Sequence, residues 1–189
     1  MEFLEYYNNP KNFRFKSFEY ALLEAKKRNL KIFVETGVAR GKQKFLFFSK
    51  INWKDGMSTM IFSDYVKYVN GFLTTCDIDQ KNIDNAKKFT KKNNDFINFV
   101  VSDSIEFLSN FKKKIDFLYL DSFDGHDTEL ASIHQLNEAK ASIDKLGENS
   151  LVLLDDKGAK TLYSKDYFVK HDFIVLAESE SQLLLSKIL

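Results

Sequence analysis

Residues 31–41 read KIFVETGVARG, a short apolar run that leads into a turn with two glycines. An apolar run of this length before a glycine is typical of a buried strand in a parallel sheet. Gly37 and Gly41 allow the backbone of the turn to pass close to a ligand, because a glycine has no side chain in the way. The same spacing also fits a plain strand-to-helix turn, so this motif alone leaves both interpretations open.

The alternation of strand and helix continues along the chain. Further strands are predicted at 72–79, 97–104, 115–121 and 150–156, helices at 17–29, 58–70, 80–94, 105–111 and 127–146, and a terminal strand pair at 173–179 and 181–189. In the helix at 127–146 we expect Leu130, Ile133, Leu136, Ile143 and Leu146 to face the core. Strands that alternate with helices predict an α/β fold with a doubly wound, mostly parallel seven-stranded sheet and an antiparallel C-terminal strand pair.

Length and composition predict one globular domain. The 189 residues are 44% apolar and 29% charged, and we interpret 1–189 as a single domain in which residues 1–30 form a helical N-terminal extension. Lys and Arg (28) nearly balance Asp and Glu (27), which argues against a nucleic-acid partner. The first residues lack the features of a secretory signal, and no apolar run is long enough to span a bilayer. We therefore expect a cytoplasmic protein without a membrane partner.

A carboxylate follows or ends each of the five predicted parallel strands. In chain order these are Glu35, Asp77 with Asp79, Asp103, Asp121, and Asp155 with Asp156. Ligands of doubly wound sheets bind beyond the carboxyl ends of the strands, so these side chains are expected to line a site. The alternative is that each of them caps the helix that follows it.

The acid after the second strand suits a sugar. A carboxylate can accept hydrogen bonds from both hydroxyls of a ribose, and we assign this role to Asp77, with Asp79 as the cap of the helix at 80–94. The first turn differs from the dinucleotide-binding pattern Gly-x-Gly-x-x-Gly, because position 39 is an alanine.

In this order the motifs resemble those of the class I S-adenosylmethionine-dependent methyltransferases, over roughly residues 30–189. The stretch DGHDTE at 124–129 is similar to a signature of small metal-dependent O-methyltransferase-like members. The resemblance implies a Rossmann-like fold and S-adenosylmethionine as cofactor. It implies that the turn residues contact the methionine part, that Asp77 holds the ribose, and that the third motif lies near the adenine. The predicted cofactor-binding residues are Glu35, Gly37, Gly41, Ser58, Asp77, Asp103 and Ser104.

The chain departs from the compact family pattern at 42–57. In that pattern a helix follows the glycines directly, whereas Glu35 and Asp77 here lie 42 residues apart, against about 20 in a minimal unit. We interpret 42–57 as an insertion in the first strand-to-helix connection. Its aromatic residues could cap the pocket, pair with a second subunit in a homodimer, or complete the core; they are Phe45, Phe47, Phe48 and Trp53.

A second group of acids suggests a metal. The fourth and fifth parallel strands are expected to be neighbours, which would bring Asp121 together with Asp155 and Asp156 at one edge of the site. Carboxylate oxygens are ligands for Mg²⁺, and a bound metal would lower the pKa of a substrate hydroxyl. The alternative is that Asp155 or Asp156 caps the next segment and faces solvent.

The leading hypothesis is an enzyme that transfers a methyl group from S-adenosylmethionine to an oxygen of a small molecule or sugar. Asp121 and His126 are the predicted catalytic residues, because a neutral imidazole can take a proton from a hydroxyl near pH 7. His126 could instead be a surface residue, and His134 is assigned to the structure of its helix. The alternatives are an NAD(P)-dependent oxidoreductase and a non-catalytic Rossmann-like binding module.

Overall fold

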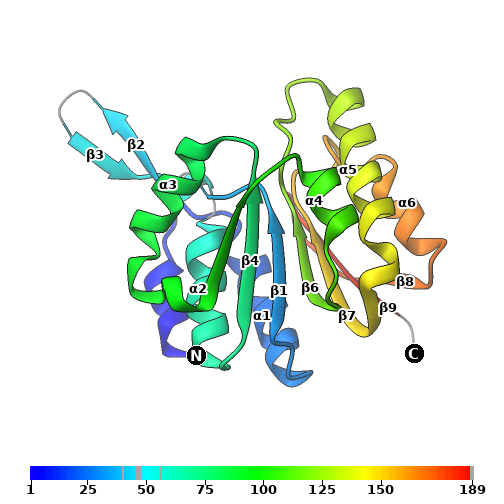
Figure 1. Ribbon diagram of the computed structural model, residues 1–189, viewed down its shortest axis with the longest axis horizontal. Helices are drawn as coiled ribbons and strands as arrows, with labels where there is room; N and C mark the ends of the chain where they lie inside the picture. Colours follow the sequence, from blue (N-terminus) through cyan, green and yellow to red (C-terminus); the bar gives the residue numbers. More distant parts are fainter. Residues whose placement is uncertain (40, 46–47, 56, 188–189) are drawn as a thin grey trace.

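The computed structural model describes residues 1–39, 41–45, 48–55 and 57–187, and for residues 42–45, 48–50 and 55 it describes the backbone only. A seven-stranded sheet with the order β5-β4-β1-β6-β7-β9-β8 forms its centre (Figure 1). Its strands are β1 (Ile32–Thr36), β4 (Phe72–Asp77), β5 (Ile97–Val101), β6 (Ile115–Leu120), β7 (Leu146–Leu154), β8 (Phe173–Glu178) and β9 (Leu183–Lys187).

The sheet is mixed, as the sequence predicts. Strands β5, β4, β1, β6 and β7 pair in parallel, and β9 lies between β7 and β8 and is antiparallel to both. The predicted α/β class with an antiparallel C-terminal strand pair is therefore confirmed. In the parallel part all carboxyl ends meet at one edge of the sheet, which is where ligands of such folds bind.

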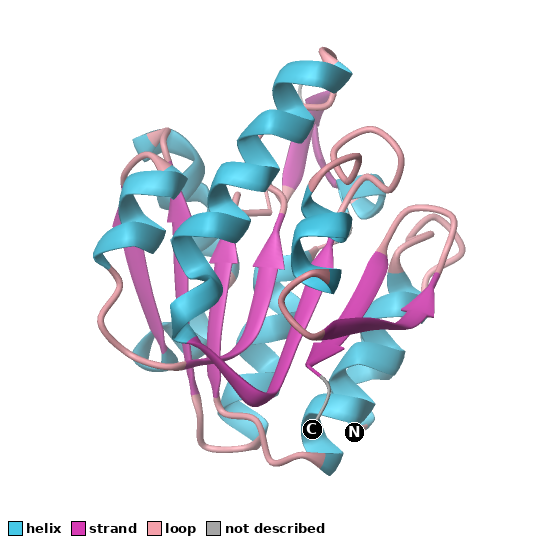
Figure 2. Ribbon diagram, turned by 90° about the vertical axis from the view of Figure 1, so that its right-hand side faces the viewer, coloured by secondary structure: helices cyan, strands magenta, loops and turns pink. Residues whose placement is uncertain are grey.

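Helices cover both faces of the sheet (Figure 2). They are α1 (Phe15–Lys27), α2 (Ser58–Tyr68), α3 (Gln80–Phe89), α4 (Ser104–Asn110), α5 (Thr128–Ser142) and α6 (Ser164–Val169), with 3-10 segments at Glu2–Tyr7, Trp53–Asp55, Lys91–Phe96 and Ile143–Lys145. On the face of α1 and α2, the rings of Phe33 and Phe117 stack at 4.5 Å. Val34 and Leu118 come next along the same strands and point into the second core, because side chains alternate across a sheet.

An antiparallel strand pair leaves the body of the protein (Figure 1). Its strands β2 (Lys42–Phe45) and β3 (Phe48–Ile51) pair only with each other. The ring of Trp53 packs against the main core and lies 5.6 Å from the ring of Tyr6. Phe47 and the side chains of Phe45 and Phe48 lie outside the described residues, so the roles predicted for them stay predictions.

The buried face of α5 differs from the predicted apolar stripe. Leu130 and Ile133 are 55% and 40% exposed, whereas Gln135 and Glu138 are buried. The expectation was wrong for Leu130 and Ile133, because part of this helix packs against polar strand ends. Leu146 is buried and Ile143 packs against the second core, as predicted. The Gln135 amide lies near the carbonyl oxygens of Leu120 and Asp155, at 3.4 and 3.5 Å. Within the described part of the chain, no helix has the length and apolar character needed to cross a bilayer.

Candidate functional site

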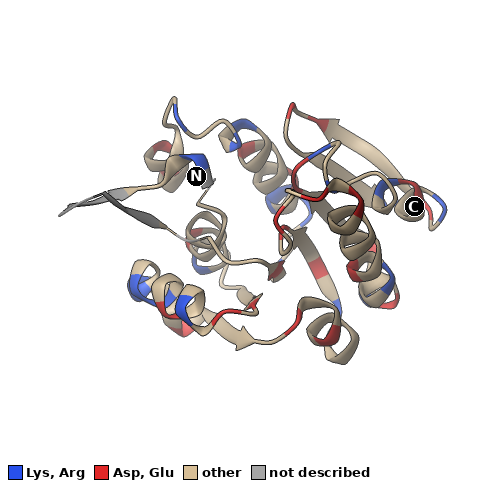
Figure 3. Cartoon of the chain, turned by 90° about the horizontal axis from the view of Figure 1, so that it is seen from above, with Lys and Arg blue, Asp and Glu red and all other residues tan. Residues whose placement is uncertain are grey.

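A polar cavity of about 140 Å³ lies at the carboxyl ends of β1, β4, β6 and β7. In the view from above, acidic and basic segments lie close together on loops near the middle of the molecule (Figure 3). The cavity brings together four of the predicted site residues. These are Gly37, Asp77, Asp121 and Asp156.

Gly37 lies where the ends of β1, β4 and β6 approach one another. Its backbone has φ +80°, and its N–H donates to the carbonyl of Cys76 at 2.8 Å. A Cβ at this position would lie 2.3 Å from the carbonyl oxygen of Asp121. Because both the positive φ and the contact exclude a side chain, the close approach of β1 to β6 requires a glycine.

Asp77 ends β4 at the rim of the cavity. Its Oδ2 accepts from the Val38 N–H at 3.2 Å, and its Oδ1 accepts from the Asp79 N–H at 2.8 Å and the Asn82 amide at 3.2 Å. These donors fix the carboxylate beside the glycine turn. Asp79 caps α3 through the Lys81 N–H, as the sequence predicts.

Glu35 lies inside the protein. Its side chain is fully buried, and its carboxylate accepts from the hydroxyls of Ser58, Thr59 and Thr75 at 2.6 to 2.8 Å. Thr59 Oγ1 also accepts from the Ala39 N–H at 2.8 Å. Glu35 therefore supports the turn through Thr59, and Ser58 lies in the same buried group. Burial raises the pKa of Glu35 to about 7, although the three hydroxyls oppose this rise.

Three other predicted cofactor-binding residues lie apart from the lining of this cavity. Gly41 packs against the ring of Phe89 beside a second cavity of about 280 Å³. Asp103 caps α4 by accepting from the N–H groups of Ile105 and Glu106. Ser104 hydrogen-bonds His134 at 2.9 Å and lies 3.3 Å from the hydroxyl of Ser122, which does line the cavity.

His134 contacts a residue that lines the cavity. His126 is exposed in the turn before α5. His134 Nε2 lies 3.0 Å from the Ser122 hydroxyl, which donates to Glu138 at 2.7 Å. Sequence reasoning missed this contact, since His134 lies on a helix whose buried face is polar.

An arginine from the N-terminal segment binds the acids at the end of β7. The Arg14 guanidinium donates to both carboxylate oxygens of Asp155 at 2.7 Å, and to Asp156 Oδ1 at 2.8 Å. It also donates to the carbonyl of Lys54 at 2.9 Å. The Asp155 side chain is fully buried, and Gln182 donates to it at 2.7 Å. The carboxylates around the guanidinium raise its pKa, so Arg14 stays charged.

Lys160 binds one carboxylate oxygen each of Asp121 and Asp156. Lys160 Nζ lies 2.7 Å from Asp121 Oδ1 and 3.0 Å from Asp156 Oδ2, and only 4% of the lysine side chain is exposed. These carboxylates raise the pKa of Lys160 despite its burial. Burial and the neighbouring Asp155 raise the pKa of Asp121, which Lys160 opposes.

The three acids have the chemistry of a metal site, but other side chains already bind their oxygens. Asp121, Asp155 and Asp156 each place an oxygen within 4.8 Å of the others, as a hard cation would require. Each of their six oxygens, however, already accepts from a described donor. The donors are Lys160 and Tyr119 for Asp121, Arg14 and Gln182 for Asp155, and Arg14 and Lys160 for Asp156. A divalent cation would have to displace two positive side chains, so the predicted Mg²⁺ site does not fit this arrangement.

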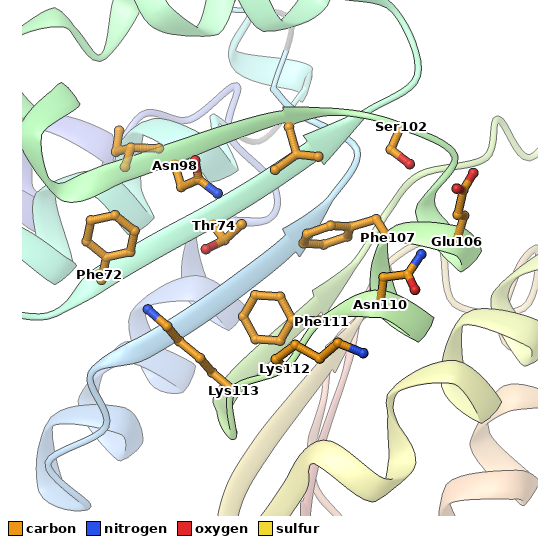
Figure 4. Close-up of a pocket in the computed structure, with 12 residues that line it drawn as sticks. Phe72, Thr74, Asn98, Ser102, Glu106, Phe107, Asn110, Phe111, Lys112 and Lys113 are labelled. Carbon is orange, nitrogen blue, oxygen red and sulfur yellow. The ribbon is translucent and has the colours of Figure 1, made fainter.

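A larger cavity lies elsewhere, on a face of the sheet. It measures about 530 Å³ and is lined by Phe72, Phe107 and Phe111 with neighbouring polar and basic residues (Figure 4). It runs over β4 and β5 beside α4 and contains none of the predicted site residues. The position of the smaller cavity beyond the strand ends agrees better with the rule for doubly wound sheets.

Comparison with known proteins identifies the family of this chain. Residues 53–157, more than half of the chain, match the family model described as a methyltransferase domain. No curated protein sequence matches the chain.

Solved structures with a similar fold include three methyltransferases of low identity. A methyltransferase from Geobacter sulfurreducens is 17% identical, with a TM-score of 0.62 over 90% of this chain and 77% of that one. The SAH-bound methyltransferase PaMTH1 from Podospora anserina is 14% identical, with a TM-score of 0.63 over 98% and 86%. The N-methyltransferase NodS from Bradyrhizobium japonicum is 13% identical, with a TM-score of 0.60 over 96% and 99%. The family match and the fold together show that this chain belongs to the class I methyltransferase family.

Proposed function

We propose that the protein binds S-adenosylmethionine beyond the carboxyl ends of β1 and β4 and transfers its methyl group to an oxygen of a small molecule or sugar. Family membership supports methyl transfer. The observation that carries the site is the carboxylate of Asp77, held 3.2 Å from the Val38 N–H beside Gly37. An oriented carboxylate at this place can accept from both hydroxyls of a ribose.

The ligand would extend past the described walls of the cavity. About 140 Å³ is below the roughly 300–1,000 Å³ of usual small-molecule sites. The hydroxyl of Ser122, which lines the cavity, lies 3.3 Å from the hydroxyl of Ser104. We place the methionine part near Gly37, the ribose at Asp77, and the adenine toward Asp103 and Ser104.

The charges favour this donor over a nicotinamide dinucleotide. Four carboxyl groups, those of Asp77, Asp121, Asp124 and Asp156, line the cavity with two described cations, Arg14 and Lys160. Such a site suits a sulfonium better than a pyrophosphate, which favours the N-terminus of a helix. The helix after β1 begins at Ser58, and the hydroxyls of Ser58 and Thr59 donate to the buried carboxylate of Glu35 instead.

In the transfer, the bond between sulfur and the methyl carbon breaks while the acceptor oxygen bonds to that carbon. The hydroxyl proton of the acceptor is lost, and the sulfur keeps the electron pair. Of the two predicted catalytic residues, Asp121 lines the cavity whereas His126 is exposed. Asp121 is therefore the better placed to accept the proton.

Calorimetric titration tests the proposal. We expect S-adenosylhomocysteine to bind in the micromolar range, and Asp77→Ala to weaken that binding at least tenfold. Asp84→Ala is the matched control, because Asp84 lies on the exposed side of α3, where its carboxylate accepts from the Gln80 amide. Binding of NAD in place of S-adenosylhomocysteine would favour the oxidoreductase, and no binding of either by the folded protein would favour a non-catalytic module.

The acceptor class has its own test. Radiolabelled S-adenosylmethionine is incubated with pools of phenols, sugars and total RNA, and the labelled fraction is identified. The nearly balanced charge of the chain, 28 basic against 27 acidic residues, supports labelling of small molecules. Labelling of RNA alone would contradict the small-molecule proposal.

A further inference from the structure

We infer that Arg14 and Lys160 permanently take the place of a divalent metal among Asp121, Asp155 and Asp156, so that this protein works without a metal ion. The inference deepens the proposed function, because it concerns the acceptor side of the same cavity. It rests on the observed contacts of the acids and not on the family resemblance, which implies a metal.

The first observation is the geometry of Arg14. Its Nε and Nη2 bind the two oxygens of Asp155 as a bidentate pair, both at 2.7 Å, and Nη2 also reaches Asp156 at 2.8 Å. A planar guanidinium matches a carboxylate in this way, and its positive charge opposes a metal ion on the same oxygens. The guanidinium side chain is only 11% exposed.

Arg14 also makes a hydrogen bond to a group other than the acids. Its third nitrogen, Nη1, donates to the Lys54 carbonyl in the 3-10 segment Trp53–Asp55. The residue therefore connects the N-terminal segment, the end of the 42–57 insertion and the strand-end acids. An arginine fixed at three places would need a rearrangement of all three to leave the site.

The second observation is the placement of Lys160. Its ammonium bridges Asp121 Oδ1 and Asp156 Oδ2. Arg14 binds Asp155 and the other oxygen of Asp156. Lys160 follows Asp156 by four residues, so the loop after β7 supplies both the acid and its cation. Because these two cations already bind oxygens of all three acids, a divalent ion could coordinate the acids only by displacing Arg14 or Lys160.

In this arrangement Lys160 and Arg14 are positioning residues. They hold the carboxylates at the strand ends in one geometry, as a metal would. The consequence is a gain-of-binding prediction: removal of the lysine charge should uncover a site that can take a metal. A purely structural lysine would give loss of stability without such a gain.

The test uses Mn²⁺ as the probe, with the full chain dialysed against EDTA. Free Mn²⁺ is measured by electron paramagnetic resonance during titration of the wild type, Lys160→Met and the double variant Lys160→Met/Asp121→Asn. We expect little binding by the wild type, at least tenfold tighter binding by Lys160→Met, and loss of that gain in the double variant. Lys157→Met is the matched control, because Lys157 pairs with Glu178 away from the acids.

Two results would overturn the inference. One is tight Mn²⁺ binding by the wild type, a measurement that needs no variant. The other is a folded Lys160→Met protein that binds Mn²⁺ no better than the wild type, and Lys160→Gln serves if the methionine variant does not fold. Titration of the same samples with S-adenosylhomocysteine separates the proposals: its failure to bind contradicts the proposed function, whereas the Mn²⁺ result concerns only the built-in cations.

Discussion

Glu35 makes the stability of this protein depend on pH in a direction that can be worked out. Its carboxyl group is fully buried and surrounded by three hydroxyl donors. Burial raises the pKa of the group from 4.5 to about 7. Between these two values the folded protein holds a proton that the unfolded chain has released. The free energy of unfolding contributed by this residue therefore falls as the pH rises through this range.

The size of the effect follows from the two pKa values. At about 1.36 kcal/mol for each pKa unit, ionising Glu35 in the folded protein costs about 3 kcal/mol at pH 8 and nothing below pH 4.5. Glu35→Gln is neutral at every pH and keeps one oxygen acceptor for the hydroxyls. Relative to the wild type, the variant should thus gain about 3 kcal/mol in unfolding free energy between pH 4.5 and pH 8.

Urea unfolding at pH 5, 6, 7 and 8 measures this difference directly. Glu148→Gln is the matched control, because Glu148 is exposed in β7 and its difference from the wild type should stay flat. A difference between Glu35→Gln and the wild type that is constant over the range would refute the reasoning, since it would mean that Glu35 titrates alike in both states.

Two further substitutions test the contacts around the cavity. Gly37→Ala forces a side chain to within 2.3 Å of the Asp121 carbonyl at a positive φ, so we expect destabilisation by more than about 1 kcal/mol and weaker S-adenosylhomocysteine binding; unchanged thermal unfolding and affinity would contradict the role of this glycine. Arg14→Met leaves the buried Asp155 without its guanidinium, and we expect a loss of about 3–5 kcal/mol in urea unfolding. The exposed pair of Lys16 and Glu19 provides the comparison, since Lys16→Met should cost at most about 1 kcal/mol. An Arg14→Met loss as small as that would mean that the cluster around Asp155 is solvated.

The fold could be predicted because its signals are local. Runs such as those before Glu35 and Asp121 are apolar over the length of one strand, and strands alternate with helices along the chain except at the 42–57 insertion. The strand order then follows from the handedness of the connections. The face of α5 could not be predicted in this way, because it buries Gln135 and Glu138 against polar strand ends while Leu130 remains exposed.

The acids of the candidate site could be predicted from the sequence, but the residues that bind them could not. Gly37, Asp77, Asp121 and Asp156 were found because strand ends converge in doubly wound sheets. Arg14 binds Asp155 across 141 residues, and no local pattern indicates such a pair. Lys160 carries a weak signal, its spacing of four from Asp156.

The most direct test of the central claim is a structure of the complex with S-adenosylhomocysteine. The account predicts the ligand beyond the carboxyl ends of β1 and β4, with its ribose hydroxyls within hydrogen-bond reach of the Asp77 carboxylate and its methionine part beside Gly37. A ligand bound instead in the groove of Figure 4, over β4 and β5, would contradict the claim.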